Sequence, residues 1–243
     1  MCGRYALIRT TADLERDYEA QGADLGEWQP RGSVNITAHA PVLLEQADEH
    51  GELERALVRG RWRFVPQREE DFRPAPLINA RLDKLQRWSG WRESYIGQRC
   101  GVPMSGYFEF IERLVEGRKV KQPYFISDPS GEPLLAAGLY SEATDPKSGF
   151  AGLGFTIITT DGVDAAGEIH DRMPVFLPAD VIDDWLALGE WDTSTRREWK
   201  EALGSMSAPI AARLKAHPTS RALNNTRTVD VHNLSLVEPV DLD

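Results

Sequence analysis

The feature that most limits the fold is the way β-rich segments follow one another without regular alternation with helices. Three of these segments, 99–113, 121–143 and 153–162, are joined by short links, and turns such as DPSGEP interrupt them. Two earlier segments, 39–46 and 53–65, flank the turn ADEHGE. Strands joined by short turns pair as hairpins, whereas a parallel sheet requires a long crossover between strands. The pattern therefore predicts an α+β fold with a mainly antiparallel, barrel-like sheet.

Four segments have the spacing or the capping residues of helices, and we expect them to flank the sheet. They are 10–20, 78–95, 177–188 and 194–203. Thr10 or Thr11 caps the first, and Pro178 opens the third. The chain has 243 residues, and no repeat or low-complexity linker divides it, so we expect a single domain over residues 1–243.

Charge is unevenly spread along a chain whose net charge is −10. Net negative charge alone disfavours nucleic acid as a partner, yet residues 51–121 hold 15 basic and 10 acidic side chains. The run RALVRGRWRF, residues 55–64, lies in this basic third. Two interpretations remain open for it. It lines a local groove for phosphates, or it is a solvated strand face rich in arginine.

The two cysteines are too few for a disulfide framework, which indicates a reducing compartment. We expect Cys100 to be a small core residue. The start of the chain lacks the pattern of a signal peptide, and no apolar run reaches membrane-spanning length, so we expect a cytoplasmic protein without membrane contact. Metal-ligand spacings and a glycine-rich phosphate loop are both missing, so we expect no cofactor and no metal.

The other cysteine, Cys2, directly follows the start methionine in MCGRY. Methionine is usually removed when the next residue is small. Removal would leave Cys2 with a free α-amine and a thiol on neighbouring carbons, a pair of nucleophiles that an internal cysteine lacks. The alternative from these residues alone is a chance cysteine at the start of a first strand.

Three further stretches carry candidate chemistry. In PLINARLD, Asn79 and Arg81 lie two apart and share a side if that segment is extended. In SGYFEF, Glu109 lies in an aromatic, apolar strand that favours the protonated carboxyl; the alternative is a buried acid paired with an arginine. In EIHDRMP, His170 is a candidate acid–base group or a structural histidine.

The order MCGRY, PLINAR, SGYFEF, IHDRMP and HPTSRALNN resembles the SRAP family, the SOS-response-associated peptidase proteins. The resemblance extends from Cys2 to about Arg227 and implies the SRAP fold. It also implies covalent capture of abasic sites in single-stranded DNA: the Cys2 amine forms a Schiff base with the sugar aldehyde, and the thiol closes a thiazolidine ring. The family's name implies a peptidase-like activity in addition. We expect a monomer that associates with the nucleoid when it is bound to DNA.

The resemblance also implies roles for individual residues. Asn79 would hold the Cys2 amine and the sugar in register, Glu109 would move protons and bear on removal of the leading residue, and His170 would act on the opened sugar. The residues implied to contact DNA are Arg4, Asn35, Arg81 and Arg172, and His217 would have a supporting structural role.

The chain departs from the family after WRFVP, where many relatives carry tryptophans that stack on bases. Here the sequence is QREEDFRPAP, in which Phe72 is the remaining candidate for stacking. One different function is compatible with a cysteine behind methionine. In an N-terminal-nucleophile amidohydrolase of the glutamine amidotransferase type, the Cys2 thiol would attack an amide and its amine would act as the base.

Overall fold

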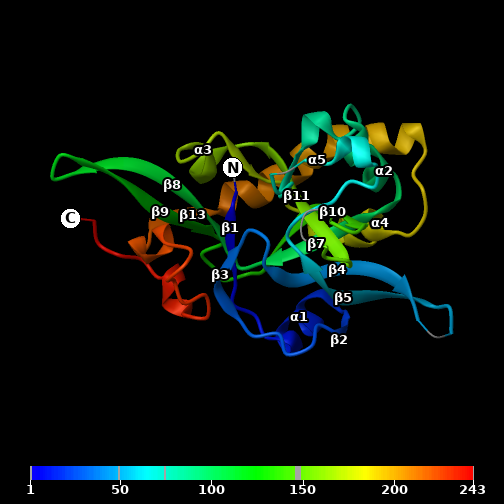
Figure 1. The fold of residues 1–243 in the computed structure, drawn as a ribbon, viewed down its shortest axis with the longest axis horizontal. Helices are drawn as coiled ribbons and strands as arrows, with labels where there is room; N and C mark the ends of the chain where they lie inside the picture. Colours follow the sequence, from blue (N-terminus) through cyan, green and yellow to red (C-terminus); the bar gives the residue numbers. More distant parts are fainter. Residues whose placement is uncertain (1, 49, 74, 146–148, 243) are drawn as a thin grey trace.

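The strands of the computed structural model, which describes residues 2–48, 50–73, 75–145 and 149–242, form two sheets (Figure 1). The five-stranded sheet has the order β13 (Lys215–Pro218), β9 (Arg118–Ser127), β8 (Gly106–Val115), β1 (Arg4–Leu7) and β3 (Arg31–Asn35). The eight-stranded sheet has the order β12 (Arg172–Pro174), β11 (Leu153–Asp161), β10 (Leu134–Glu142), β7 (Arg99–Met104), β4 (His39–Ala47), β5 (Leu53–Arg61) and β2 (Gln21–Asp24). Its remaining strand, β6 (Asn79–Arg81), pairs with β11.

Most strand pairs are antiparallel, and the predicted α+β fold is confirmed. The pairs β2–β5, β5–β11 and β6–β11 are parallel. The sheets are barrel-like but not closed, and the consecutive strands β7 and β8 belong to different sheets. The predicted turn between β4 and β5 is present: the Asp48 carboxylate accepts from the backbone N–H groups of His50 and Glu52, while Glu49 lies outside the described residues.

The chain passes from one sheet to the other at Ser105 and Gly106. The Ser105 N–H donates to the Ala6 carbonyl over 2.8 Å, which brings β8 beside β1. A Cβ atom at position 106 would lie 2.7 Å from the Ile126 carbonyl oxygen and 2.5 Å from the Phe125 ring, so glycine permits the close approach of β9. The continuous β-rich segment 99–113 is therefore two strands that lie in two sheets.

Alternation along β1 and β8 separates two hydrophobic clusters. The larger cluster joins the two sheets and includes Cys2, Tyr5 and Tyr107 together with Cys100, which is fully buried as predicted. The smaller cluster lies on the opposite face of the five-stranded sheet. Its members are Ala6, Phe108, Phe125, Leu223, Leu236 and Val237. The last three place the C-terminal segment against that face, so residues after β13 help to cover the sheet that carries the start of the chain.

The helices are α1 (Thr11–Tyr18), α2 (Ser89–Gly97), α3 (Asp164–Gly167), α4 (Ile182–Leu186) and α5 (Thr193–Arg213). Short 3-10 turns span Glu69–Asp71, Leu82–Lys84, Ala179–Val181, Arg221–Asn224 and Leu234–Val237. Thr10 caps α1 as predicted, in a capping box whose other member is Asp13. No helix of the described residues is long and apolar enough to span a membrane.

The predicted helix over 78–95 is wrong in its first half. Asn79 to Arg81 form β6, and α2 begins only at Ser89. The apolar spacing of Leu82, Leu85 and Trp88 arises from packing of a 3-10 turn and the turns after it, since Leu85 is fully buried. Backbone pairing of β6 with β11, far away in the sequence, overrides that local signal.

Candidate functional site

The second residue of the chain lies inside the molecule. Cys2 is fully buried beside the start of β1, and its Sγ donates to the Arg4 carbonyl over 3.8 Å. Burial raises the pKa of the Cys2 thiol, and the nearby Glu109 carboxylate raises it further. The thiol is therefore protonated near neutral pH, so it becomes a nucleophile only when a neighbouring base accepts its proton.

Asn79 reaches Cys2 because β6 is held as a strand. Parallel pairing places Asn79 opposite Ile157 of β11, and its Nδ2 donates to the Cys2 carbonyl over 2.8 Å. The Asn79 Oδ1 atom is buried and has no hydrogen-bond partner among the described residues. One end of this amide thus fixes the start of the chain, and the other end is a buried acceptor beside it.

Glu109 is buried at the same place, on the face of β8 that points to the large cluster. It is 3% exposed, and burial raises its pKa to about 7. The raised pKa agrees with the first of the two alternatives that the sequence left open for Glu109, a carboxyl that keeps its proton among the aromatic and apolar residues of SGYFEF. A carboxyl group that titrates near neutral pH can both accept and donate a proton under the conditions in which the protein works.

His170 belongs to the loop between α3 and β12. Its Nδ1 accepts from the Arg172 N–H over 3.0 Å and lies 2.7 Å from Asp171 Oδ1. The first contact suits the neutral ring and the second suits the imidazolium. Burial lowers the pKa of His170, which favours the neutral ring with its proton on Nε2. The Asp171 carboxylate acts on the pKa of Glu109 as well as on that of His170, so this loop lies beside the buried glutamate.

Sequence reasoning missed one polar group of this site. Tyr107 pairs with Tyr5 of β1 and lies two residues before Glu109, hence on the same face of β8. Its hydroxyl is buried without a hydrogen-bond partner among the described residues, and burial raises its pKa well above the ordinary value. Cys2 and Glu109 contribute to that rise, so all three lie together. Tyr107 could have been found from the sequence, because residues two positions apart on a strand lie on the same face and Tyr107 is two positions before Glu109.

Two of the predicted DNA contacts have buried side chains. Arg4 is 7% exposed, its guanidinium donates to the Leu223 carbonyl, and it lies 5.6 Å from the Phe110 ring centre on the opposite face of the sheet from Tyr5. Arg172 donates to Asp161 Oδ1 over 2.6 Å and to the Thr159 carbonyl. Both arginines therefore bind other parts of the chain in this structure.

The other two predicted DNA contacts are more accessible. The Arg81 side chain is 50% exposed and forms an ion pair of 2.9 Å with Asp83. Asn35 is half-buried at the end of β3, opposite Arg4, and accepts from the Ser33 hydroxyl over 3.0 Å. Arg81 is the predicted arginine whose guanidinium solvent reaches most readily.

Arg81 and Arg172 meet at one open pocket because their strands flank β11. Arg81 lies opposite Thr159 and Arg172 lies opposite Asp161. The pocket has a volume of about 310 Å³, and Lys200 of α5 also lines it. Sequence reasoning missed Lys200, which lies more than a hundred residues from Arg81 and carries no local signal. Three basic side chains thus converge around two carboxylates, those of Asp83 and Asp161.

His217 has the structural role that the sequence predicted for it. It lies on β13 opposite Phe125, and its Nε2 donates to the Val237 carbonyl over 2.8 Å. This contact holds the C-terminal segment. Within the described part of the chain, no group of three histidine, cysteine or acidic side chains is arranged to hold a metal ion.

The fold and the site define a class of α+β proteins in which a buried cysteine at the second position lies beside a half-buried asparagine, a buried glutamate and a buried tyrosine, with a histidine next to them. The chain belongs to the family described as SOS response associated peptidase (SRAP), which matches residues 1–226. The family predicted from the sequence blocks is confirmed.

Relatives across the family carry similar names. The chain is 28% identical over 99% of its length to the whole of the abasic site processing protein YedK of Escherichia coli. It is 29% identical over 93% of its length to the abasic site processing protein HMCES of Xenopus tropicalis, and covers 76% of that protein. It is 32% identical over 76% of its length to the abasic site processing protein YoaM of Bacillus subtilis, and covers 79% of it.

A solved structure has the same fold. The crystal structure of a protein from Bacteroides thetaiotaomicron matches 98% of this chain and 100% of its own, with a TM-score of 0.74 and 20% sequence identity. At that identity, the likeness shows the fold alone.

Proposed function

We propose that the protein captures abasic sites in single-stranded DNA as a covalent adduct on Cys2. The observation that carries the proposal is the convergence of Cys2, Asn79 and Glu109, with the Cys2 carbonyl held at 2.8 Å by Asn79 and the glutamate titrating near pH 7. Membership of a family whose relatives are named abasic site processing proteins supports the choice of substrate.

The reaction requires that Met1, which lies outside the described residues, is removed. The free α-amine of Cys2 would have a reference pKa of about 7.7–8.0, so part of it is unprotonated near neutral pH. Its lone pair attacks the sugar aldehyde, and loss of one water gives the imine. The Cys2 sulfur then adds to the same carbon while the thiol proton passes to nitrogen, which closes a thiazolidine ring. No oxidant or reductant takes part.

Glu109 is the proton carrier in this scheme. In its ionised form it accepts the proton that the thiol must lose, and in its protonated form it assists the departure of water from the first addition product. Its raised pKa provides both forms near pH 7. We assign to the same carboxyl group a part in hydrolysis of the Met1–Cys2 bond, which would be the peptidase-like activity.

The remaining polar groups position the substrate. Asn79 Oδ1 and the Tyr107 hydroxyl are buried beside Cys2 and supply an acceptor and a donor for the opened sugar. His170, as a neutral ring, promotes opening of the sugar to the aldehyde and reversal of the adduct. Arg81 contacts a phosphate beside the lesion, and Asn35 lines the path of the DNA strand. For Arg4 and Arg172 we propose positioning roles, because both guanidinium groups already bind the chain.

We also propose that the protein acts as a cytoplasmic monomer that joins the nucleoid when it binds DNA. Both cysteines are free and buried, which is compatible with a reducing compartment.

A denaturing gel tests the proposed function. Purified protein is mixed with a single-stranded oligonucleotide that carries one abasic site, and intact mass establishes that Met1 has been removed. We expect a slowly migrating band that requires the lesion, is lost in Cys2→Ala, and loses heat stability in Cys2→Ser because oxygen does not close an equally stable ring. Cys100→Ala, which removes the other buried thiol, is the matched control and should form the band. No band from protein that lacks Met1 would reject the proposal, and glutamine hydrolysis would then be assayed.

A further inference from the structure

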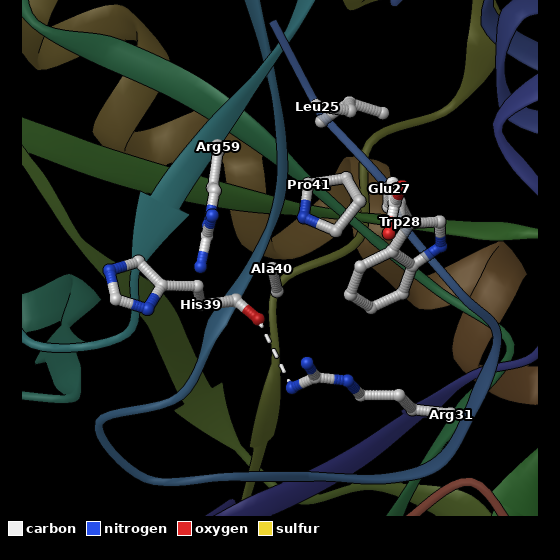
Figure 2. A pocket seen from close by; sticks show the side chains of 8 residues that line it. All are labelled: Leu25, Glu27, Trp28, Arg31, His39, Ala40, Pro41 and Arg59. Atoms are coloured by element: carbon white, nitrogen blue, oxygen red, sulfur yellow. Dashed lines mark hydrogen bonds between the residues drawn. The ribbon is translucent and has the colours of Figure 1, made fainter.

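A second group of basic side chains surrounds a small pocket at the opposite end of β3 from Asn35. Arg31 begins β3, His39 begins β4, and Arg59 lies on β5. With Trp28 they line a pocket of about 150 Å³, which we call the Arg31 pocket (Figure 2). Arg59 belongs to the basic run 55–64, for which the sequence left a phosphate groove and a solvated face as alternatives.

The β4–β5 hairpin and the segment before β3 hold these side chains in place. Arg59 pairs with Pro41 across the hairpin, and Figure 2 shows its side chain extending toward His39. The Arg31 guanidinium donates to the His39 carbonyl over 3.3 Å and lies 5.2 Å from the Trp28 ring centre. The Trp28 ring is itself fixed, since its Nε1 donates to the Arg9 carbonyl over 3.0 Å. The pocket is therefore built from groups that have defined positions.

Among the side chains that the structure describes, no carboxylate forms an ion pair with Arg31 or Arg59 of the Arg31 pocket. Three other arginines of the run, Arg55, Arg61 and Arg63, lie within ion-pair distance of Asp183 or Asp145. Arg59 and Arg31 have no such carboxylate among the described residues, and Arg31 Nε is buried without a hydrogen-bond partner there.

Burial and repulsion by the Arg59 guanidinium lower the pKa values of the two neighbouring basic groups, Arg31 and His39. Burial lowers the pKa of Arg31, and Arg59 lowers it further. Burial and then Arg59 do the same to the pKa of His39. Of the described residues that line the pocket, one is acidic, the exposed Glu27. Two guanidinium groups and an imidazole against one exposed acid form an environment that an anion would stabilise.

We propose that Arg31, His39 and Arg59 bind a phosphate group, and that in the DNA complex this group is a backbone phosphate of the captured strand. The volume of the pocket supports a phosphate and not a whole nucleoside, because sites for larger ligands usually enclose about 300–1,000 Å³. Guanidinium groups suit phosphate oxygens through paired N–H donors. The inference rests on the proposed function, since the phosphate belongs to the same DNA strand.

The position of the pocket relative to Cys2 fits a continuous strand. Arg31 and Asn35 are four residues apart on β3, so their backbones are about 13 Å from one another. Asn35 lies opposite Arg4 at the end of β1 nearer Cys2, and Leu7 lies opposite Arg31 at the other end. On this proposal the DNA passes from the lesion at Cys2 to the Arg31 pocket along β3, the edge strand of the five-stranded sheet.

Arg59→Gln tests the pocket directly, because it removes a side chain that makes no ion pair among the described residues. The matched control is Arg118→Gln, an exposed arginine at the start of β9. Binding of an undamaged single-stranded oligonucleotide is measured by fluorescence anisotropy over a range of salt concentrations. We expect Arg59→Gln to weaken binding and reduce the log–log salt slope by about 0.7, the value for one phosphate contact on a single strand. Arg118→Gln should keep the slope of the unaltered chain.

A second measurement separates a DNA phosphate from a free one. Thermal unfolding is followed in inorganic phosphate and in chloride at equal ionic strength. We expect phosphate to raise Tm for the unaltered chain, to raise it less for Arg59→Gln, and to raise it more for Glu27→Gln, which removes the opposing charge. An unchanged salt slope in Arg59→Gln would overturn the proposal; if phosphate still stabilised the protein, the pocket would be a site for free anions and not for DNA.

Failure of the covalent chemistry would be visible separately. If the unaltered chain formed no adduct while Arg59→Gln still lost a phosphate contact, the Arg31 pocket would stand as a DNA contact and the capture reaction would be rejected. If the unaltered chain formed the adduct and Arg59→Gln kept the full salt slope, the capture reaction would stand and the pocket would be rejected.

Discussion

The side-chain amide of Asn79 donates to the backbone carbonyl of Cys2 over 2.8 Å, which ties the start of the chain to a strand 77 residues further on. A chain terminus is ordinarily among the least ordered parts of a protein. Here Cys2, the residue that we propose to be reactive, is held by Asn79 of β6, and β6 is held by its pairing with β11. Pre-orientation of this kind is what an amine needs in order to meet an aldehyde in one defined geometry.

Asn79→Asp should slow adduct formation by replacing the donor to the Cys2 carbonyl with an acceptor. The matched control is Asn224→Asp, because Asn224 Nδ2 donates to the Lys121 carbonyl at the same distance of 2.8 Å, on an exposed part of the chain. Single-turnover crosslinking rates of the two variants decide the point. We expect a loss of about tenfold for Asn79→Asp and none for Asn224→Asp, on the basis of about 1.4 kcal/mol for the half-buried hydrogen bond to Cys2. Equal rates in both variants would remove Asn79 from the site.

Glu109→Gln should slow capture and remove a pH dependence of stability. Burial raises the pKa of Glu109 in the folded chain to about 7, from an ordinary value of 4.5. The folded state therefore binds the proton more tightly than the unfolded state, and the stability gained is fully present below the ordinary pKa and lost as pH rises through about 7. Between about pH 5 and about pH 8, Tm of the unaltered chain should fall relative to that of Glu109→Gln.

The control for this substitution is Glu112→Gln, on the same strand, where the carboxylate is exposed and pairs with Lys119 at 2.6 Å. It should follow the unaltered chain in both Tm and crosslinking rate. Parallel Tm curves for Glu109→Gln and the unaltered chain would mean that Glu109 titrates in its ordinary range.

Tyr107→Phe should reduce capture without lowering stability. The hydroxyl has no hydrogen-bond partner among the described residues, so its removal breaks no hydrogen bond there and takes away a buried, unsatisfied polar atom. If it donates to the sugar, capture should slow by about fivefold, which corresponds to about 1 kcal/mol for one hydrogen bond. Tyr18→Phe is the comparison: that hydroxyl donates to the Leu134 carbonyl over 3.1 Å, so its loss should lower Tm and leave capture unchanged. Unchanged capture by Tyr107→Phe would exclude contact with the substrate.

Arg81→Ala should weaken binding of single-stranded DNA and lower its log–log salt slope by about 0.7. Arg16→Ala is the matched control, since both arginines are exposed and each forms an ion pair of 2.9 Å with a nearby aspartate. Anisotropy titrations over several salt concentrations give the slopes. A slope for Arg81→Ala that equals the slope for Arg16→Ala would take Arg81 out of the DNA contacts.

Short-range features were predictable from the sequence because the residues that cause them are neighbours. The Thr10 cap requires only Asp13, and burial of Glu109 follows from the aromatic residues on either side of it. An extended segment would place Asn79 and Arg81 on the same side, but the helical spacing of the residues that follow predicts a helix over the whole segment. The hydrogen bonds that make this segment a strand come from β11, which is distant in the sequence, so no residue near Asn79 indicates them.

Burial of the arginines could not be predicted for the same reason. Arg4 binds the carbonyl of Leu223, and Arg172 binds Asp161 and Thr159, so their environment depends on how the C-terminal segment and β11 are placed. The arginines of the basic run 55–64 fall into two groups, which neither a single phosphate groove nor a single solvated strand face describes. Arg55, Arg61 and Arg63 lie near aspartates, whereas Arg59 joins Arg31, a residue from another strand, at a pocket.

Intact mass spectrometry of the DNA adduct decides whether Cys2 is the residue that captures the lesion. We expect a species whose mass is that of the chain without Met1 plus the abasic oligonucleotide minus one water, with the modification mapped by proteolysis to Cys2. An adduct of that mass on a lysine, or an adduct that still carries Met1, would contradict capture by the amine and thiol of Cys2.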